Sequence, residues 1–156
     1  MQVEVVENHT DDIINALPEA IETALEMIGA EASGIAGELS PKDTGLLRNS
    51  MTYAIAGKPA KKDTYKASDP DKQGKIKEGS YEGIAPDDGE QAVFIGTNVE
   101  YAPYIEYGHH SYTGRHMIQH AIMDYADKYQ KMAEQVLEGG AALSFNFDDN
   151  SKGGVI

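Results

Sequence analysis

Two histidines, His116 and His120, stand four residues apart in a segment with helical spacing. Side chains at that spacing share one face of a helix, which is how metallohydrolases present two zinc ligands. Glu106, His109 and His110 precede them. The segment "HMIQH" lacks the glutamate that follows the first histidine in the zincin motif, and it specifies no third ligand. Two titratable residues at a helix start explain the pattern more simply, and at a subunit contact they would make assembly pH-sensitive. We assign no metal ligand.

The triplet Asp43, Thr44 and Gly45 matches the sequence around the catalytic carboxylate of aspartic peptidases, and a short chain could supply one carboxylate per subunit of a dimer. Its flanks differ, because "ELSPK" precedes it in place of an apolar strand and "LLRNS" follows it in place of small residues. The structural alternative is that Asp43 or Thr44 caps a short turn, with Gly45 supplying unusual backbone angles. Phosphate-binding loops and nucleophile elbows are missing. We predict no enzyme and no cofactor, with an aspartic-peptidase-like or histidine-metal hydrolase as the alternative.

Composition narrows the remaining classes of protein. The chain of 156 residues has a net charge of −13 and no cysteine. It lacks the clustered Lys and Arg with which proteins grip phosphate backbones. It also lacks an apolar run of roughly 20 residues that could cross a bilayer, and "MQVEVVENHT" does not resemble a signal peptide. We expect a soluble protein made in the cytoplasm, with one domain over residues 1–139 and a flexible tail over 140–156.

The elements that must position these residues are a helix at each end and strands between them. A short lead-in precedes a main helix that starts near Pro18 and ends near Ser40. Its glutamates form a face that is solvated or meets basic groups, and its glycines predict tight contact with a neighbour; these residues are Glu19, Glu22, Glu26 and Glu31, and Gly29, Gly34 and Gly37. Residues 114–140 resume helical spacing and end at two glycines.

Two strands are predicted over residues 51–57 and 91–97. Between them, residues 58–90 hold seven of the thirteen basic residues beside eight acids and hardly any aliphatic side chains. Such a segment cannot bury enough apolar surface to order itself, so we predict a long mobile polar loop. The fold class is therefore α+β: a small antiparallel sheet packed against a long N-terminal helix and a C-terminal helix.

The segment "VEYAPYIEYGHH", residues 99–110, fits neither helical nor strand spacing along its length. Pro103 can begin a single helical turn that Gly108 ends, which places Tyr104 and Tyr107 on nearby faces. The tyrosines would bury their rings and leave their hydroxyls at a wet edge, as at subunit contacts. Glu106 needs a partner if it is buried, and Arg48 is the candidate.

Taken in order, these features resemble the head-to-tail joining or tail-completion proteins of long-tailed bacteriophages, over roughly residues 17–135. The matching residues are Pro41, Asp43, Thr44, Gly45, Leu47, Arg48 and Ser50, then Tyr101, Ala102, Tyr104, Glu106, Tyr107 and Gly108, and finally Ala121. The sequence departs from the family at His109, where threonine is usual, and at His116 and His120, where prolines are common.

The resemblance implies a structural virion protein at the head–tail interface. It implies a self-assembled ring, most often a hexamer, with the portal, adaptor or head-closure protein on one side and the tail tube or tail terminator on the other. DNA would pass through without specific binding, which an acidic channel wall suits. Residues 58–90 could be a contact arm that orders on assembly. A small monomeric adaptor protein is the other alternative.

Overall fold

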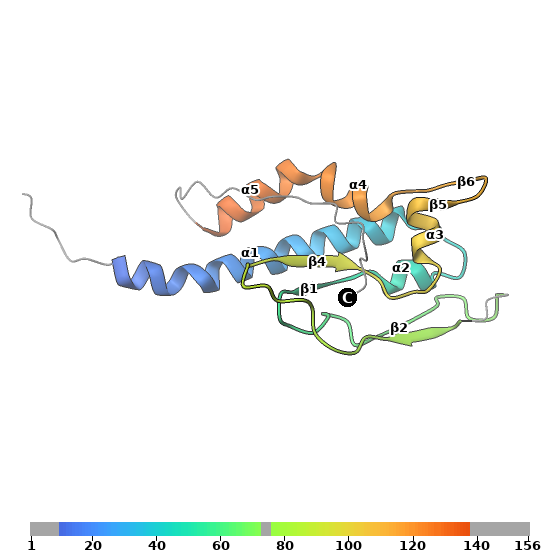
Figure 1. Ribbon diagram of the computed structural model, residues 1–156, viewed down its shortest axis with the longest axis horizontal. Helices are drawn as coiled ribbons and strands as arrows, with labels where there is room; N and C mark the ends of the chain where they lie inside the picture. The colour runs from blue at the N-terminus through green and yellow to red at the C-terminus, as the bar shows by residue number, and fades with distance from the viewer. Residues whose placement is uncertain (1–9, 73–75, 138–156) are drawn as a thin grey trace, which may run out of the picture.

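The computed structural model describes residues 10–72 and 76–137, with side chains from residue 17 onward. It is an α+β fold of five helices and six short strands within these residues (Figure 1). The helices are α1 (Thr10–Leu39), α2 (Leu46–Ser50), α3 (Ala102–Tyr107), α4 (Met117–Met123) and α5 (Ala126–Val136). The strands are β1 (Thr52–Ile55), β2 (Thr64–Lys66), β3 (Glu78–Ser80), β4 (Val93–Gly96), β5 (Gly108–His109) and β6 (Tyr112–Thr113).

Helix α1 is the central element of the molecule. It lies between α4 and α5 on one side and the strands β1 and β4 on the other (Figure 1). Its apolar residues recur every three or four positions and form one stripe along the helix. One side of this stripe packs against α4 and α5, and the other side packs against β1 and β4. One core, beside the middle of α1, comprises Ala24, Ile28, Ala32, Tyr53, Ile95, Tyr129 and Ala133. The other comprises Ala36, Leu46, Leu47, Met51, Tyr65, Val99, Ala102, Met117 and Ala121.

Helix α1 continues through Pro18, so the prediction of a lead-in and a separate main helix is wrong. A proline inside a helix removes one backbone hydrogen bond and usually bends or breaks the helix. Here Pro18 is exposed. Its ring therefore displaces no core side chain, and the long packed stripe that follows supports the helix.

The glycines of α1 divide into two kinds. A Cβ at Gly29 would lie 2.9 Å from Val93 Cγ2 and closer still to the Tyr53 ring, and one at Gly37 would lie 3.1 Å from the Arg48 carbonyl oxygen. These two glycines confirm the predicted close contact. At Gly34 the prediction is wrong, because a Cβ there would meet no atom within 4 Å.

The glutamate face of α1 meets lysines from the segment after β1 and from α5. Glu22 pairs with Lys58, and Glu26 lies 3.8 Å from the Lys61 ammonium. On the side of α5, Glu31 pairs with Lys128. All these side chains are roughly half exposed, so each pair adds at most about 1 kcal/mol.

Strands β1 and β4 pair antiparallel, with Thr52 opposite Gly96 and Ile55 opposite Val93. Every residue of β1 is buried, because α1 covers one face and the segment that follows β1 covers the other. That segment is the predicted polar loop. It does connect the two expected strands, as the topology requires.

The prediction that residues 58–90 lack structure of their own is wrong for Thr64–Lys66 and Glu78–Ser80. Strands β2 and β3 form an antiparallel pair there, with Tyr65 opposite Gly79. Tyr65 is only 8% exposed and belongs to a core. Tyr81 packs beside it, with ring centroids 5.4 Å apart. The segment has hardly any aliphatic residues, but these two tyrosine rings supply the apolar area that orders it.

Polar side chains fasten this hairpin to the rest of the molecule. The Tyr65 hydroxyl donates to Asn98 Oδ1 at 2.7 Å, and Asn98 Nδ2 donates to the Ser80 carbonyl at 2.7 Å. Asn49 Nδ2 lies 2.8 Å from both the Lys66 carbonyl and Ser68 Oγ. The two asparagines thus satisfy backbone groups that the short strands leave free.

The predicted C-terminal helix is two helices, α4 and α5, separated at Asp124 and Tyr125. The Ala121 carbonyl, which would accept from residue 125 in a continuous helix, accepts the Tyr129 hydroxyl. Tyr129 is 1% exposed, so its ring fills the space beneath the break. The predicted glycine stop and the tail over 140–156 lie outside the described residues. None of the described helices is long and apolar enough to cross a bilayer.

Candidate functional site

Exposed aromatic and imidazole side chains gather at one end of the molecule. We call this group the aromatic rim; it consists of Tyr101, Tyr104, Tyr107, His109, His110 and Tyr112. The rim is built by α3 and by the β5–β6 hairpin that follows it directly (Figure 1). Tyr104 is 55% exposed and its ring meets the His109 ring edge-on, with centroids 5.1 Å apart. The His109 and His110 rings lie 4.0 Å apart.

The predicted helical turn within the rim is confirmed. Helix α3 has Pro103 in its first turn and ends at Gly108. Gly108 has a φ of 88°, and a Cβ there would come within 2.7 Å of the Gly114 nitrogen. Glycine is therefore needed at this position both for the left-handed backbone and for the close return of the hairpin.

Glu106 links the rim to α4, and its partners are backbone N–H groups and not Arg48, the predicted partner. The side chain is only 4% exposed. Its Oε2 accepts the Ile118 N–H and its Oε1 accepts the Gln119 N–H, each at 3.0 Å. Arg48 is exposed, and no described contact joins it to Glu106. The predicted pair is thus wrong: the first turn of α4 provides the buried carboxylate with the donors that it needs.

The start of α4 explains why an external carboxylate is required. His116 precedes the helix in a left-handed conformation with φ 48° and provides no side-chain cap. The first N–H groups of a helix have no partner within it, and an acidic group is favoured at that end by the helix dipole. The sequence indicates this need only by the absence of a capping residue, since no Ser, Thr, Asp or Asn directly precedes Met117.

Main-chain bonds reinforce the same junction. The Ile105 carbonyl accepts the Arg115 N–H at 2.7 Å, and the Glu106 carbonyl accepts the His116 N–H at 3.0 Å. The backbone and the side chain of Glu106 therefore both bind the segment that leads into α4. This makes α3, the hairpin and α4 one mechanical unit, so the rim cannot shift without breaking charge-assisted bonds.

The first motif forms a tight turn ahead of α2. Gly45 has a φ of 80°, as its predicted role requires, and a Cβ there would lie 2.8 Å from Ser68 Oγ. Thr44 Oγ1 accepts the Leu46 N–H at 3.3 Å. Asp43 caps nothing; its carboxylate is 75% exposed and lies 3.4 Å from the Lys72 ammonium. Of the two capping candidates, the structure selects Thr44.

The two sequence motifs come together in the structure. Leu46 and Leu47 of the first share a core with Ala102 of the second. At the surface above this core, burial raises the pKa of the Tyr101 phenol, and the nearby Asp43 charge raises it further. The rim therefore rests on the turn that the first motif makes.

Residues outside both motifs complete this support. The hydroxyls of Ser50 and Thr97 lie 2.6 Å apart and are both buried. The Tyr81 hydroxyl donates to the Ser50 carbonyl. Ser50 is part of the first motif, but nothing in the sequence indicates Thr97 or Tyr81 as its partners. Thr97 directly follows β4 and Tyr81 belongs to the polar segment, and only the fold brings them to α2.

The histidine pair lies at the start of α4. The rings of His116 and His120 are 6.3 Å apart, and His120 Nδ1 is 2.9 Å from Asp124 Oδ2. Within residues 10–72 and 76–137, no three histidine, aspartate or glutamate side chains gather in a way that could hold a metal ion.

Comparison with protein-family models, with curated proteins and with solved structures finds no match.

Proposed function

We propose that the chain is a structural virion protein of a tailed bacteriophage, which forms a ring at the head–tail interface as a tail-completion or head–tail joining subunit. Its proposed partners are further copies of itself in a hexameric ring, a portal, adaptor or head-closure protein on one side, and a tail tube or tail terminator protein on the other. DNA passes through the ring without specific binding. The roles of Asp43 and Glu106 in this proposal are architectural.

The observation that carries the proposal is an aromatic surface that is both rigid and exposed. Glu106 fixes the rim to α4 through two charge-assisted bonds, while Tyr104 and Tyr107 remain 55% and 47% exposed. Tyrosines are enriched at subunit contacts because they combine large apolar area with a hydroxyl that tolerates a wet edge.

The charge of the chain suits a component through which DNA moves. The net charge is −13, and Lys58, Lys61 and Lys128 are paired with glutamates of α1. A strongly acidic wall repels the phosphate backbone and so does not retain it. A monomeric adaptor would show the same charge, so the assembly state separates the two proposals.

The proposal is tested by deleting the gene from the viral genome and restoring it in trans. We expect deletion to give filled heads and separate tails by electron microscopy, and the native chain to restore joined particles. The variant Tyr104→Ser/Tyr107→Ser should fold but fail to restore joining. The matched control is Met27→Ser/Met123→Ser, which removes two similarly exposed apolar side chains outside the rim. Normal tailed particles without the chain would refute the proposal.

A further inference from the structure

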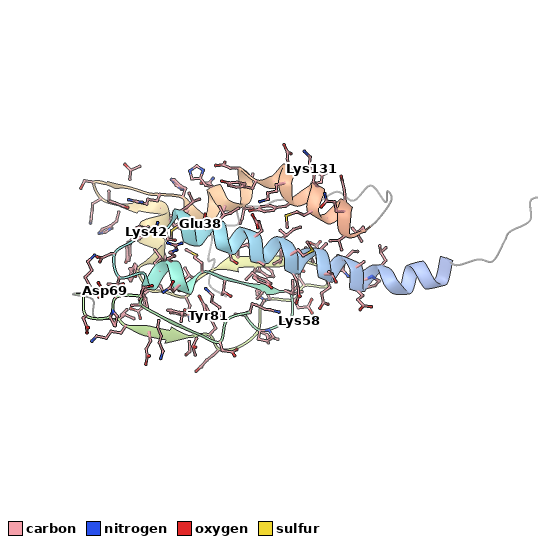
Figure 2. All side chains as sticks on the ribbon, turned by 180° about the vertical axis from the view of Figure 1, so that it is seen from behind. Glu38, Lys42, Lys58, Asp69, Tyr81 and Lys131 are labelled. Carbon is pink, nitrogen blue, oxygen red and sulfur yellow. The ribbon has the colours of Figure 1, made fainter. Side chains whose placement is uncertain are left out.

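A groove opens on the side of α1 that faces α2 and the edge of β1. It has a volume of about 450 Å³ and is lined by residues that include Ser33, Gly34, Gly37, Arg48, Tyr53 and Lys62. We call it the Arg48 groove. Figure 2 shows this side of the molecule, with α2 beside the end of α1 where Glu38, a further lining residue, is labelled.

Gly34 is the first indication that the groove is a binding surface. A glycine in the middle of a helix is less favourable than alanine. At Gly29 and Gly37, close neighbours that leave no room for a Cβ explain why glycine is present. Gly34 has none, since a Cβ there would meet only open space. With no side chain at this position, the backbone of α1 is accessible from the groove.

Arg48 is the second sign. Its guanidinium has no ion pair, hydrogen bond or ring contact among the described residues, although the chain is strongly acidic. The ammonium of Lys62, which also lines the groove, donates to the Asn49 carbonyl at 2.6 Å and has no ion pair among the described residues. Glu38 is the single carboxylate among the lining residues. The groove therefore offers two cations around a floor of small residues and the Tyr53 ring.

The aromatic rim has the complementary chemistry. It presents tyrosine faces, which attract a guanidinium, and the exposed carboxylate of Glu100 stands directly before Tyr101. A closed ring of identical chains needs a heterologous contact, in which two different patches of one chain meet. The rim and the groove are two such patches.

We propose that the Arg48 groove of one copy receives the aromatic rim of a second copy of this chain. This inference rests on the proposed ring and assigns its subunit contact. Arg48 would stack on a rim tyrosine, Lys62 would face Glu100, and the open backbone at Gly34 would admit the β5–β6 hairpin.

The absence of cysteine allows a direct test by disulfide cross-linking. Chains carrying Ala30→Cys, at the groove, are mixed with chains carrying Ser111→Cys, at the tip of the hairpin, both as concentrated purified protein and in assembled particles. We expect a disulfide-linked heterodimer from the mixture and no dimer from either chain alone. The control mixture pairs Ser111→Cys with Lys131→Cys, an exposed site on α5 labelled in Figure 2, and should give no link.

A second variant separates docking from folding. Gly34→Leu places a side chain in the groove at a helix position with free space, so the melting temperature should stay equal or rise. The cross-link yield should nevertheless fall at least tenfold. Arg48→Ala should reduce it similarly, whereas Lys42→Ala, which removes an exposed cation outside the groove, should not.

The outcomes distinguish this inference from the proposed function. Equal linkage of Ser111→Cys to both partner sites, no linkage in protein or particles, or full linkage with Gly34→Leu would each overturn the contact between groove and rim. Particles that contain the chain and join normally with Gly34→Leu would overturn it as well, while the proposed function would stand. Particles that lack the chain would instead refute the proposed function.

Discussion

At the scale of single residues, Glu106 decides the geometry of the candidate site. A buried carboxylate is costly unless charged or polar donors surround it. The sequence indicated that Glu106 would need a partner, but not which one. Arg48 was the plausible choice by charge, whereas the structure uses two backbone N–H groups of α4. Backbone donors are invisible in a sequence, so this kind of partner is found only by asking which helix lacks a cap.

Two substitutions of Glu106 should destabilise the fold by different amounts. Glu106→Ala removes both acceptors and leaves two N–H groups without partners, which should cost about 3 kcal/mol in the free energy of unfolding. Glu106→Gln keeps one acceptor oxygen and should cost about half of that. Urea unfolding followed by circular dichroism measures both. The exposed Glu100→Gln is the control and should stay within about 0.5 kcal/mol of the native chain; an equally small effect at Glu106 would contradict its role.

Tyr129 gives the fold a dependence on alkaline pH. Burial raises the pKa of its phenol from 10.0 to about 12, and the charge of Glu31 adds to the effect. The folded state therefore favours the neutral phenol. This stabilisation is complete below pH 10 and is lost as the pH rises from 10 toward 12. Burial raises the pKa of Tyr65, Tyr81 and Tyr101 in the same direction.

Unfolding measured between pH 9 and 12 should accordingly show falling stability in the native chain. Tyr129→Phe should be less stable at neutral pH, by about 1 kcal/mol for the lost hydroxyl bond, but its stability should fall less steeply with alkali. Parallel curves for the two chains would show that Tyr129 does not carry the effect. The exposed Tyr112→Phe serves as the control.

At the scale of elements, the long helix α1, the helical character of the C-terminal region and the β1–β4 pair were predictable from the spacing of their apolar residues. What was missed depends on contacts between distant elements. Tyr65 and Tyr81 order the β2–β3 hairpin only because Asn98 and Ser50 are there to bind them. At the break between α4 and α5, the Tyr129 hydroxyl donates to the Ala121 carbonyl. The spacing of apolar residues does not reveal such a contact.

The glycines of α1 provide a matched test of its two faces. Gly29→Ala should destabilise the protein by about 1–3 kcal/mol, because the new methyl group overlaps the Tyr53 ring and Val93 in a packed core. Gly34→Ala should stabilise it by about 0.5–1 kcal/mol, because the helix gains propensity and nothing obstructs the methyl group. Thermal and urea unfolding compare both with the native chain. The same sign for both substitutions would contradict this placement of α1.

At the scale of the whole molecule, the fold class was predictable and the assembly was not. The sequence places an α+β domain around a long helix, and the structure has that form. On one chain the arrangement leaves an aromatic rim and an open groove, whose Arg48 guanidinium has no ion pair with any residue that the structure describes. In the proposed ring, these two surfaces of neighbouring copies meet.

The most direct measurement is electron cryomicroscopy of intact tailed particles, with the copies of this chain counted by quantitative mass spectrometry. The account predicts a ring of this fold at the head–tail junction, with several copies per particle and the rim of each copy in contact with its neighbour. Particles from which the chain is absent, or in which it occurs away from the junction, would contradict the account.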